Sequence, residues 1–358
     1  MHNCSKKLQP NTITRRVMVG NVALGSGLPV VVQSMLTAAP SDAQANLEQI
    51  KQLEDAGCEI IRMAIPRFEC MPAFAEVCKR SPLPVVADVH FSARIALGAI
   101  ESGASKLRIN PGNIGGIEKC KPIISAAKNA GVAIRIGVNA GSLDKKLAED
   151  STLSQPEKLA KSACEYVEAF ENLGFNNLVV SAKAHDVNTT IQAYRILSKE
   201  LPKIPLHIGI TEAGTLFQGL IKSSAGLGTL LESGIGDTMR ISLTDDPVQE
   251  VRACWTLLSA LGLRRRHPEI ISCPTCGRCQ VELIPIAKKI ESALQNVTKP
   301  VSVAVMGCVV NGPGEAASAD IGVACANGSG VIFAKGQTLQ KVPEDKIIET
   351  LLSEIGKL

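Results

Sequence analysis

The chain has 358 residues, of which 45% are hydrophobic and 20% charged, enough to bury the core of one large domain and of a second, smaller one. Aromatic residues make up only 3%, and the net charge of +4 is mild, so we expect no nucleic acid partner and consider a small anionic substrate a better match. No stretch approaches eighteen consecutive apolar residues, and we therefore expect no membrane-spanning helix.

The N-terminal sequence "MHNCSKKLQPNTITRR" lacks the apolar core of a signal peptide. We therefore expect a cytoplasmic protein in a reducing compartment. There, clustered cysteines bind metals, and single ones such as Cys58 and Cys120 are buried as small hydrophobic side chains. The next segment, "RRVMVGNVALGSGLPVVV", predicts a hairpin that leads into the first strand and closes the floor of the fold.

From about residue 15 to residue 262, short β-rich runs alternate with amphipathic stretches such as 42–57 and 117–131. Eight strand–helix units in about 250 residues are typical of a closed (β/α)8 barrel of the TIM type. The alternative, an open doubly wound sheet, would carry a glycine-rich fingerprint after its first strand, and "VQSMLTAAPSD" has none. We therefore predict a TIM-type barrel over residues 1–262. The eight predicted strands are 29–35, 59–65, 84–91, 105–110, 132–139, 176–183, 205–211 and 237–243.

A basic segment with a proline, "LGLRRRHPEI" (261–270), interrupts the alternation and predicts a linker into a second domain at 263–358. After three clustered cysteines we expect a helix at about 281–296, a strand at 301–307 and a glycine-rich turn. A β-hairpin in "DIGVACANGSGVIFAKG" and a closing helix at 343–355 complete it. The predicted fold class is therefore α/β, a TIM-type barrel followed by a small α+β domain.

Four predicted strands carry an arginine between apolar residues: Arg62, Arg108, Arg135 and Arg240. The outer faces of barrel strands pack under helices, where a lone charge is costly, so we expect these side chains to point inward near the C-terminal mouth. Lys183 follows the sixth strand at the same level. Five cations at one mouth would repel one another unless an anion bound between them, and the guanidinium fork matches phosphate oxygens. The pattern favours a phosphate or diphosphate substrate; the alternative is that each arginine pairs with a structural carboxylate.

Other polar side chains lie at the same strand ends. A single histidine there is often an ordinary core residue, but as a set they are typical of substrate positioning and acid–base chemistry. Glu212, in "HIGITEAG", is the candidate catalytic proton donor or acceptor because its carboxyl group would lie among the cations. The other members are Asp88, His90, Asn110, Asn139, His207 and Thr211.

The stretch "ISCPTCGRCQ" (271–280) places Cys273, Cys276 and Cys279 three residues apart, as in ferredoxin-type iron–sulfur sites. Cys308, in "VMGCVVNGPGEAASADIG", follows a predicted strand and supplies a further ligand. Either all four cysteines bind, which also fits a structural zinc site, or Cys273, Cys276 and Cys308 bind together with a residue of another type. The glycine-rich turn "NGPGEAASA" lets the backbone approach closely, as a large cluster requires, and favours iron–sulfur over zinc.

The motifs "CPTCGRC", "GCVVNGPGEAASADIG", "LRINPGNIG" and "GITEAG" together resemble those of the 4-hydroxy-3-methylbut-2-enyl diphosphate synthase family in its two-domain bacterial form. The resemblance covers nearly the whole chain. It implies a [4Fe–4S] cluster held by Cys273, Cys276, Cys308 and Glu315, with Cys279 outside the ligand set. It also implies a diphosphate site in the barrel and a homodimer in which the cluster of one subunit caps the barrel of the other.

The implied reaction is the two-electron reductive ring opening of 2-C-methyl-D-erythritol 2,4-cyclodiphosphate, on the methylerythritol phosphate route to isoprenoids. Flavodoxin or ferredoxin would supply the electrons one at a time. A function from another class is a binding protein, in which a phosphate-binding barrel carries a structural zinc ribbon. Metal content discriminates between the two, because a colourless protein with one zinc and no sulfide would exclude the enzyme.

Overall fold

A computed structural model describes residues 13–279, 281–295, 297–308 and 319–358. It divides into two compact units, Met1–Arg264 and Arg265–Leu358, and each is described by itself. None of the helices in the described residues combines the length and the hydropathy that a membrane crossing needs.

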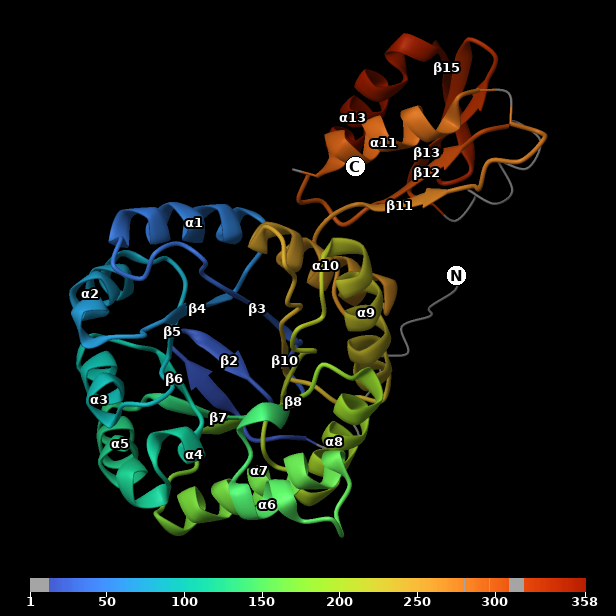
Figure 1. The fold of residues 1–358 in the computed structure, drawn as a ribbon. Coiled ribbons are helices and arrows are strands. Elements are labelled where there is room, and N and C mark those ends of the chain that lie inside the picture. The colour runs from blue at the N-terminus through green and yellow to red at the C-terminus, as the bar shows by residue number, and fades with distance from the viewer. Residues whose placement is uncertain (1–12, 280, 296, 309–318) are drawn as a thin grey trace. The chain divides into compact units, whose positions relative to one another are not determined.

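The first unit is a barrel of parallel strands (Figure 1). The hydrogen-bonded order is β8-β7-β6-β5-β4-β3-β10-β9, and a parallel bridge between Val180 of β8 and Leu206, just before β9, joins the two ends. The predicted closed TIM-type barrel is therefore confirmed, and every predicted strand contains an observed one. The strands are β3 (Val31–Met35), β4 (Ile60–Ala64), β5 (Val85–Asp88), β6 (Lys106–Ile109), β7 (Ala133–Asn139), β8 (Leu178–Lys183), β9 (His207–Ile208) and β10 (Thr238–Met239).

Helices surround the strands (Figure 1) because their apolar faces pack on the outer side of the barrel. In the helix predicted at 42–57, Ile50 and Leu53 are buried, and the Asp42 carboxylate caps the N-terminus by accepting from the backbone N–H of Ala45. The helices are α1 (Ala43–Asp55), α2 (Met71–Arg80), α3 (Ala93–Glu101), α4 (Pro111–Ile114), α5 (Ile117–Ala130), α6 (Lys145–Glu149), α7 (Gln155–Asn172), α8 (Val187–Glu200), α9 (Leu216–Glu232) and α10 (Pro247–Ala260), with short turns η1 (Phe68–Cys70) and η2 (Ala140–Ser142).

The predicted N-terminal hairpin closes the floor of the barrel. Its strands β1 (Val17–Val19) and β2 (Val22–Leu24) pair antiparallel. Their buried side chains form one apolar cluster with inward-facing residues near the starts of the barrel strands, including Val31, Ile60 and Val86. The floor is therefore apolar over this cluster, and among the inward-facing polar residues Asp88, Asn139 and Lys183 lie at the opposite, C-terminal ends of their strands.

Alternation along each strand separates the outer core from the interior. In β6, Leu107 and Ile109 belong to the outer core, so Lys106 and Arg108 point into the barrel. In β4, Ile61 and Met63 face outward in the same way and Arg62 faces inward. The period of two thus places the strand arginines inside, as predicted.

The barrel unit extends two residues beyond the predicted boundary at 262 because Arg264 is bound to it. Its guanidinium donates to both carboxylate oxygens of Glu59, at 2.7 and 2.9 Å, and to the carbonyl of Val30 at 2.6 Å. It also lies over the ring of Trp255, 4.5 Å from the centroid. These contacts hold the first half of the predicted linker against the barrel.

The second unit is a five-stranded mixed sheet with helices on one face. Strands β11, β12 and β13 run parallel, and β13, β14 and β15 are antiparallel. The predicted helices, the strand at 301–307 and the hairpin are confirmed, but β11 and β15 were missed because most of their residues are partly or fully exposed and carry no apolar run. The elements are β11 (Glu269–Ser272), α11 (Leu283–Leu294), β12 (Ser302–Met306), β13 (Ile321–Ala326), β14 (Ser329–Ala334), β15 (Gln337–Pro343), η3 (Glu344–Lys346) and α13 (Ile347–Lys357).

Candidate active site

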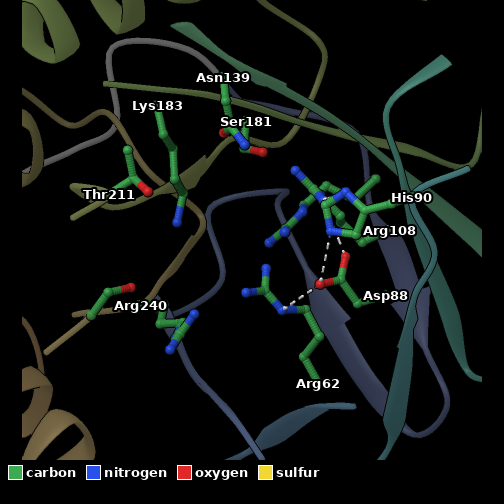
Figure 2. A pocket seen from close by; sticks show the side chains of 11 residues that line it. Arg62, Asp88, His90, Arg108, Asn139, Ser181, Lys183, Thr211 and Arg240 are labelled. Atoms are coloured by element: carbon green, nitrogen blue, oxygen red, sulfur yellow. Dashed lines mark hydrogen bonds and ion pairs between the residues drawn. The ribbon is translucent and has the colours of Figure 1, made fainter. Parts of the chain in front are cut away.

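The interior of the barrel holds a cavity of about 150 Å³ toward the C-terminal ends of the strands. Figure 2 shows its polar side chains converging from opposite sides of the barrel. Most of the site residues predicted from the sequence meet here, so the prediction of a cationic mouth agrees with the observed geometry. The lining consists of Arg62, Asp88, His90, Arg108, Arg135, Asn139, Ser181, Lys183, Thr211, Arg240 and Ser242.

Asp88, at the end of β5, joins three basic side chains. Its Oδ1 lies 3.2 Å from Nη1 of Arg108, and its Oδ2 lies 3.8 Å from Nε of Arg62 and 3.5 Å from Nε2 of His90. Burial acts to raise the pKa of Asp88, but the charge of Arg62, the hydrogen bond with His90 and the charge of Arg108 hold it well below its ordinary value. The carboxylate therefore stays ionised and orients the guanidinium groups.

Arg108 lies in a space that a glycine leaves open. A Cβ atom at Gly137 of β7 would come within 2.6 Å of Nε of Arg108. The Nη1 of Arg108 lies 2.9 Å from Nε2 of His90. With the amide of Asn139 oriented to satisfy both of its groups, its oxygen accepts from Nη2 of Arg108 at 3.2 Å and its nitrogen donates to the Val138 carbonyl at 3.1 Å. Both terminal nitrogens of the Arg108 guanidinium, Nη1 and Nη2, are thus held by hydrogen bonds.

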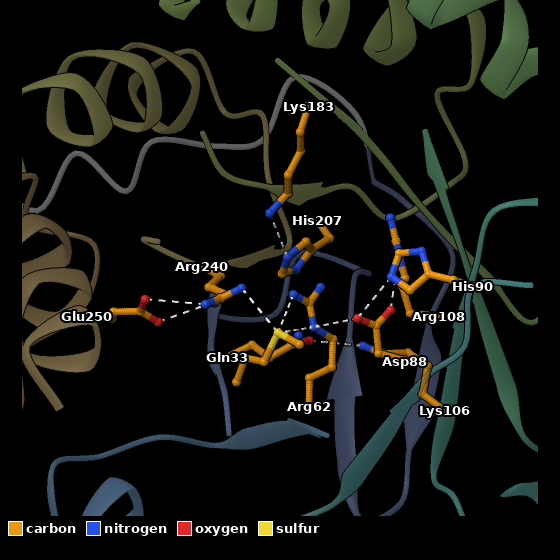
Figure 3. A network of polar contacts seen from close by, with 11 residues as sticks. Gln33, Arg62, Asp88, His90, Lys106, Arg108, Lys183, His207, Arg240 and Glu250 are labelled. Carbon is orange, nitrogen blue, oxygen red and sulfur yellow. Dashed lines mark hydrogen bonds and ion pairs between the residues drawn. The ribbon is translucent and has the colours of Figure 1, made fainter. Parts of the chain in front are cut away.

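Arg240 is held from behind by a buried carboxylate (Figure 3). Its Nε and Nη2 each lie 3.3 Å from an oxygen of Glu250 in α10, and the backbone N–H of Leu243 donates to the same carboxylate at 2.9 Å. The sulfur of Met35 accepts from Nη2 of Arg62 at 2.7 Å and lies 3.6 Å from Nη1 of Arg240. The alternative stated above, in which the arginines pair with structural carboxylates, therefore holds for some of them.

Arg135 and Lys183 differ from the other cations at the mouth. Among the residues that the structure describes, no carboxylate oxygen lies within 4.0 Å, the distance of an ion pair, of the side-chain nitrogens of either residue. The Nε and Nη1 of Arg135 are buried and have no hydrogen-bond partner there. Burial, and then repulsion by neighbouring arginines, lowers the pKa of both groups well below its ordinary value. An anion in the cavity would relieve this excess of positive charge.

Three predicted site residues do not line the cavity. Asn110 is buried as the N-cap of α4, where its Oδ1 accepts from the backbone N–H of Gly112 at 3.1 Å. His207 is fully buried deeper in the barrel, with Nε2 at 3.2 Å from Nζ of Lys183. Glu212 follows β9 with a left-handed φ of 53° and an exposed side chain, so it does not lie among the cations as expected. Its catalytic role stays a prediction.

Four polar residues of the barrel interior were not predicted from the sequence. Ser181 and Ser242 line the cavity, and Lys106 and Gln33 lie buried, with Nζ of Lys106 3.5 Å from Oε1 of Gln33. Three of them are two residues from a predicted cation: Lys106 precedes Arg108, Ser181 precedes Lys183, and Ser242 follows Arg240. Extending the period of two along each strand would have found them.

In the second unit, parallel pairing places two of the predicted metal ligands at one edge of the sheet. Cys273 follows β11 and Cys308 follows β12 after Gly307, and the register sets Ser272 opposite Val305. The backbone N–H of Gly307 donates to the sulfur of Cys273 at 3.3 Å. Thiolates at one sheet edge, with a backbone donor to sulfur, are a soft ligand set that fits an iron–sulfur cluster.

The other two cysteines of the motif lie differently. Cys276 is exposed, and hydrogen bonds from the backbone and side chain of Arg278 lower the pKa of its thiol. Cys279 is half-buried, with its thiol 3.2 Å from the Val281 carbonyl and close against Gly307. Glu315 lies outside the described residues, and within those residues no three candidate ligands converge closely enough to hold a metal ion. The choice between Cys279 and Glu315 therefore stays a prediction.

Comparisons with known proteins match both units. A family model described as "GcpE TIM-barrel domain" covers residues 14–255, and one described as "GcpE protein C-terminal domain" covers residues 269–357. A relative from Lawsonia intracellularis, named 4-hydroxy-3-methylbut-2-en-1-yl diphosphate synthase (flavodoxin), is 49% identical over 96% of each chain. A relative of the same name from Sulfurihydrogenibium is 50% identical over 96% of this chain and 98% of its own.

Solved structures resemble the barrel at low identity. The dihydropteroate synthase of Yersinia pestis aligns with a TM-score of 0.50 and 13% identity, over 69% of this chain and 97% of its own. At this identity the likeness concerns the fold alone.

Proposed function

The chain belongs to the 4-hydroxy-3-methylbut-2-en-1-yl diphosphate synthase family, and we propose that its barrel mouth binds the diphosphate group of 2-C-methyl-D-erythritol 2,4-cyclodiphosphate. The protein is an oxidoreductase of the methylerythritol phosphate pathway to isoprenoids. Its reaction adds two electrons, together with protons from solvent, to the cyclic diphosphate, opens the ring and releases one oxygen atom as water.

The observation that carries the binding proposal is the excess of positive charge at the cavity. In the part of the chain that the structure describes, five basic side chains of arginine and lysine line it, against the single lining carboxylate of Asp88. In the described part of the chain, Arg135 and Lys183 have no carboxylate partner, so their donors are available to phosphate oxygens. Arg108 would present a fork whose geometry is already fixed by Asp88, His90 and Asn139.

For the cofactor, we propose a [4Fe–4S] cluster held by Cys273, Cys276, Cys308 and Glu315. The places of Cys273 and Cys308 at the ends of two parallel strands support this assignment, while that of Glu315 rests on the family resemblance. The cluster would supply the two electrons one at a time, from flavodoxin, the donor that the names of the relatives specify for them.

We also propose a homodimer, on the family resemblance, in which the cluster of one subunit serves the barrel of the other. Mixing an Arg135→Ala barrel variant with a Cys308→Ala cluster variant should restore part of the activity when subunits exchange. Heterodimers without any recovered activity would instead indicate that each chain uses its own cluster.

An anaerobic assay tests the function as a whole. The holoprotein, the cyclodiphosphate and a strong one-electron reductant should yield 4-hydroxy-3-methylbut-2-enyl diphosphate, detected by chromatography and mass spectrometry. Iron and sulfide should be present in equal amounts, at about four of each per chain. One zinc per chain without sulfide, and no product, would favour the binding protein with a zinc ribbon.

A further inference from the structure

Four basic side chains form a buried layer in the barrel. Lys106, Arg135, Lys183 and His207 point inward from the neighbouring strands β6, β7, β8 and β9, and the four side chains are 0%, 1%, 8% and 0% exposed. We call them the buried basic layer. Arg135 and Lys183 line the cavity, whereas Lys106 and His207 are buried outside its lining. Figure 3 shows Lys183 reaching toward His207.

Within the described ranges of the chain, the layer has almost no compensating negative charge. Asp88 is engaged with Arg62, Arg108 and His90. Glu250 is engaged with Arg240. Among the described residues, the hydrogen-bond partner of Nζ of Lys106 is the Gln33 amide oxygen at 3.5 Å, and Nδ1 of His207 is buried without a partner. Burying several positive charges in this way is unfavourable, and it favours the unprotonated forms of the two lysines and the histidine.

The pair of Lys183 and His207 is where a proton is most readily left out. The two nitrogens, Nζ and Nε2, lie 3.2 Å apart, and one of them must be unprotonated for a hydrogen bond to form at this distance. Burial, and then repulsion by Arg135, lowers the pKa of each group well below its ordinary value. Among the described residues, Arg135 and these other titratable or charged groups surround the pair: Arg62 on β4, Lys106 and Arg108 on β6, Arg240 just after β10, Cys254 on α10 and Tyr194 on α8, whose hydroxyl donates to the His207 carbonyl.

We propose that binding of the diphosphate is coupled to proton uptake by the pair of Lys183 and His207. This inference rests on the proposed function, because the anion that triggers the uptake is the cyclodiphosphate. An anion in the cavity favours the charged form of each basic group beside it, so the bound state holds a proton that the free protein lacks. The proton comes from solvent, and no electron moves in this step.

Proton uptake makes affinity depend on pH with a defined sign. The complex holds the extra proton, so the dissociation constant rises as pH rises through the range in which the free pair is unprotonated. For an uptake of one proton, the rise is about tenfold per pH unit. The ligand does not contribute near neutral pH, because each ring phosphorus carries a single, strongly acidic hydroxyl group.

Isothermal titration calorimetry of the holoprotein under anaerobic conditions measures the uptake directly. The cyclodiphosphate is titrated in HEPES and in Tris at the same pH between 7 and 8.5, and the difference in heat divided by the difference in buffer ionisation enthalpy gives the number of protons. We expect an uptake approaching one proton per site. Binding with no difference between buffers and no change in affinity over this range would overturn the inference, whereas absence of binding would instead contradict the proposed function.

A variant separates the buried layer from other sources of protons. Lys106→Met removes a basic group that faces the pair without lining the cavity, so the variant should bind the ligand with a smaller uptake and a shallower pH dependence. Lys51→Met, on the exposed face of α1, is the matched control and should keep the wild-type uptake. If wild type and a folded Lys106→Met variant take up equal numbers of protons, the uptake does not depend on the charges of the buried basic layer, and this part of the inference is wrong.

Discussion

Replacing Gly137 by alanine tests whether the fork of Arg108 is fixed by the space that this glycine leaves. An alanine Cβ would lie 2.6 Å from Nε and 3.1 Å from Nη2 of Arg108, well inside ordinary contact distance. Arg108 is 5% exposed and bound to Asp88 and His90, so its guanidinium cannot move away without losing those contacts. The variant therefore displaces the group that is proposed to bind the diphosphate while leaving its charge in place.

The size of the effect follows from the contacts that are lost. A hydrogen bond to a charged group contributes about 1.5–3 kcal/mol, which corresponds to a dissociation constant raised roughly 10- to 150-fold. Overpacking of a buried strand costs a further ~1–3 kcal/mol of folding stability, and the melting temperature should fall by several degrees. The absorption spectrum of the cluster should not change, because the substitution lies in the other unit.

Anaerobic calorimetry with the cyclodiphosphate, together with thermal melts, measures both effects. Gly228→Ala is the matched control, because its Cβ would lie 3.8 Å from the nearest atom outside its own helix, Cδ1 of Leu257. That variant should bind like the wild type and gain about 0.5–1 kcal/mol of helix stability. Wild-type affinity in Gly137→Ala would refute the claim that the placement of Arg108, rather than its charge alone, determines diphosphate binding.

Three further predictions concern other parts of the molecule. Arg108→Lys keeps the charge but loses the fork, so calorimetry should show weaker substrate binding with an unchanged cluster spectrum; loss of the cluster or of the fold would favour a structural role. Cys279→Ser should retain the [4Fe–4S] spectrum and much of the activity, whereas Glu315→Gln should alter the spectrum and strongly reduce turnover; the opposite pattern would make Cys279 the fourth ligand. Burial lowers the pKa of Lys106 below its ordinary 10.5, so between the pKa of the folded protein and 10.5 the unfolded chain binds more protons, and stability rises with pH across this range. Lys106→Met should therefore raise the melting temperature at pH 7 and flatten its rise toward pH 10. A lower melting temperature for the variant at pH 7 would contradict this.

The sequence predicted the barrel because its eight strands carry long apolar runs with helices between them. Periodicity is weaker in the second unit, where β11 follows Pro268 and β15 is exposed along most of its length. Those strands exist because a neighbouring strand supplies their hydrogen bonds, and this pairing leaves no apolar signature in the strand itself.

Candidate site residues were predicted with unequal success, for a physical reason. A residue within a strand has its direction set by the period of two, and Arg62, Arg108 and Arg135 therefore point inward as expected. A residue just beyond a strand has no such constraint: the side chain of Asn110 caps α4, and Glu212 adopts a left-handed backbone conformation with its side chain exposed. Sequence position alone did not distinguish these cases.

The sequence by itself determined the fold class, the inward direction of the strand cations and the cysteine spacing, because local periodicity and residue chemistry encode each of them. Only the tertiary structure decided which cations have a carboxylate partner. Asp88 comes to Arg62 and Arg108 from a neighbouring strand, and Glu250 reaches Arg240 from α10, whereas Arg135 and Lys183 have no such partner among the described residues. Pairing of this kind depends on distances between side chains that are far apart in the chain, and closure of the barrel sets those distances.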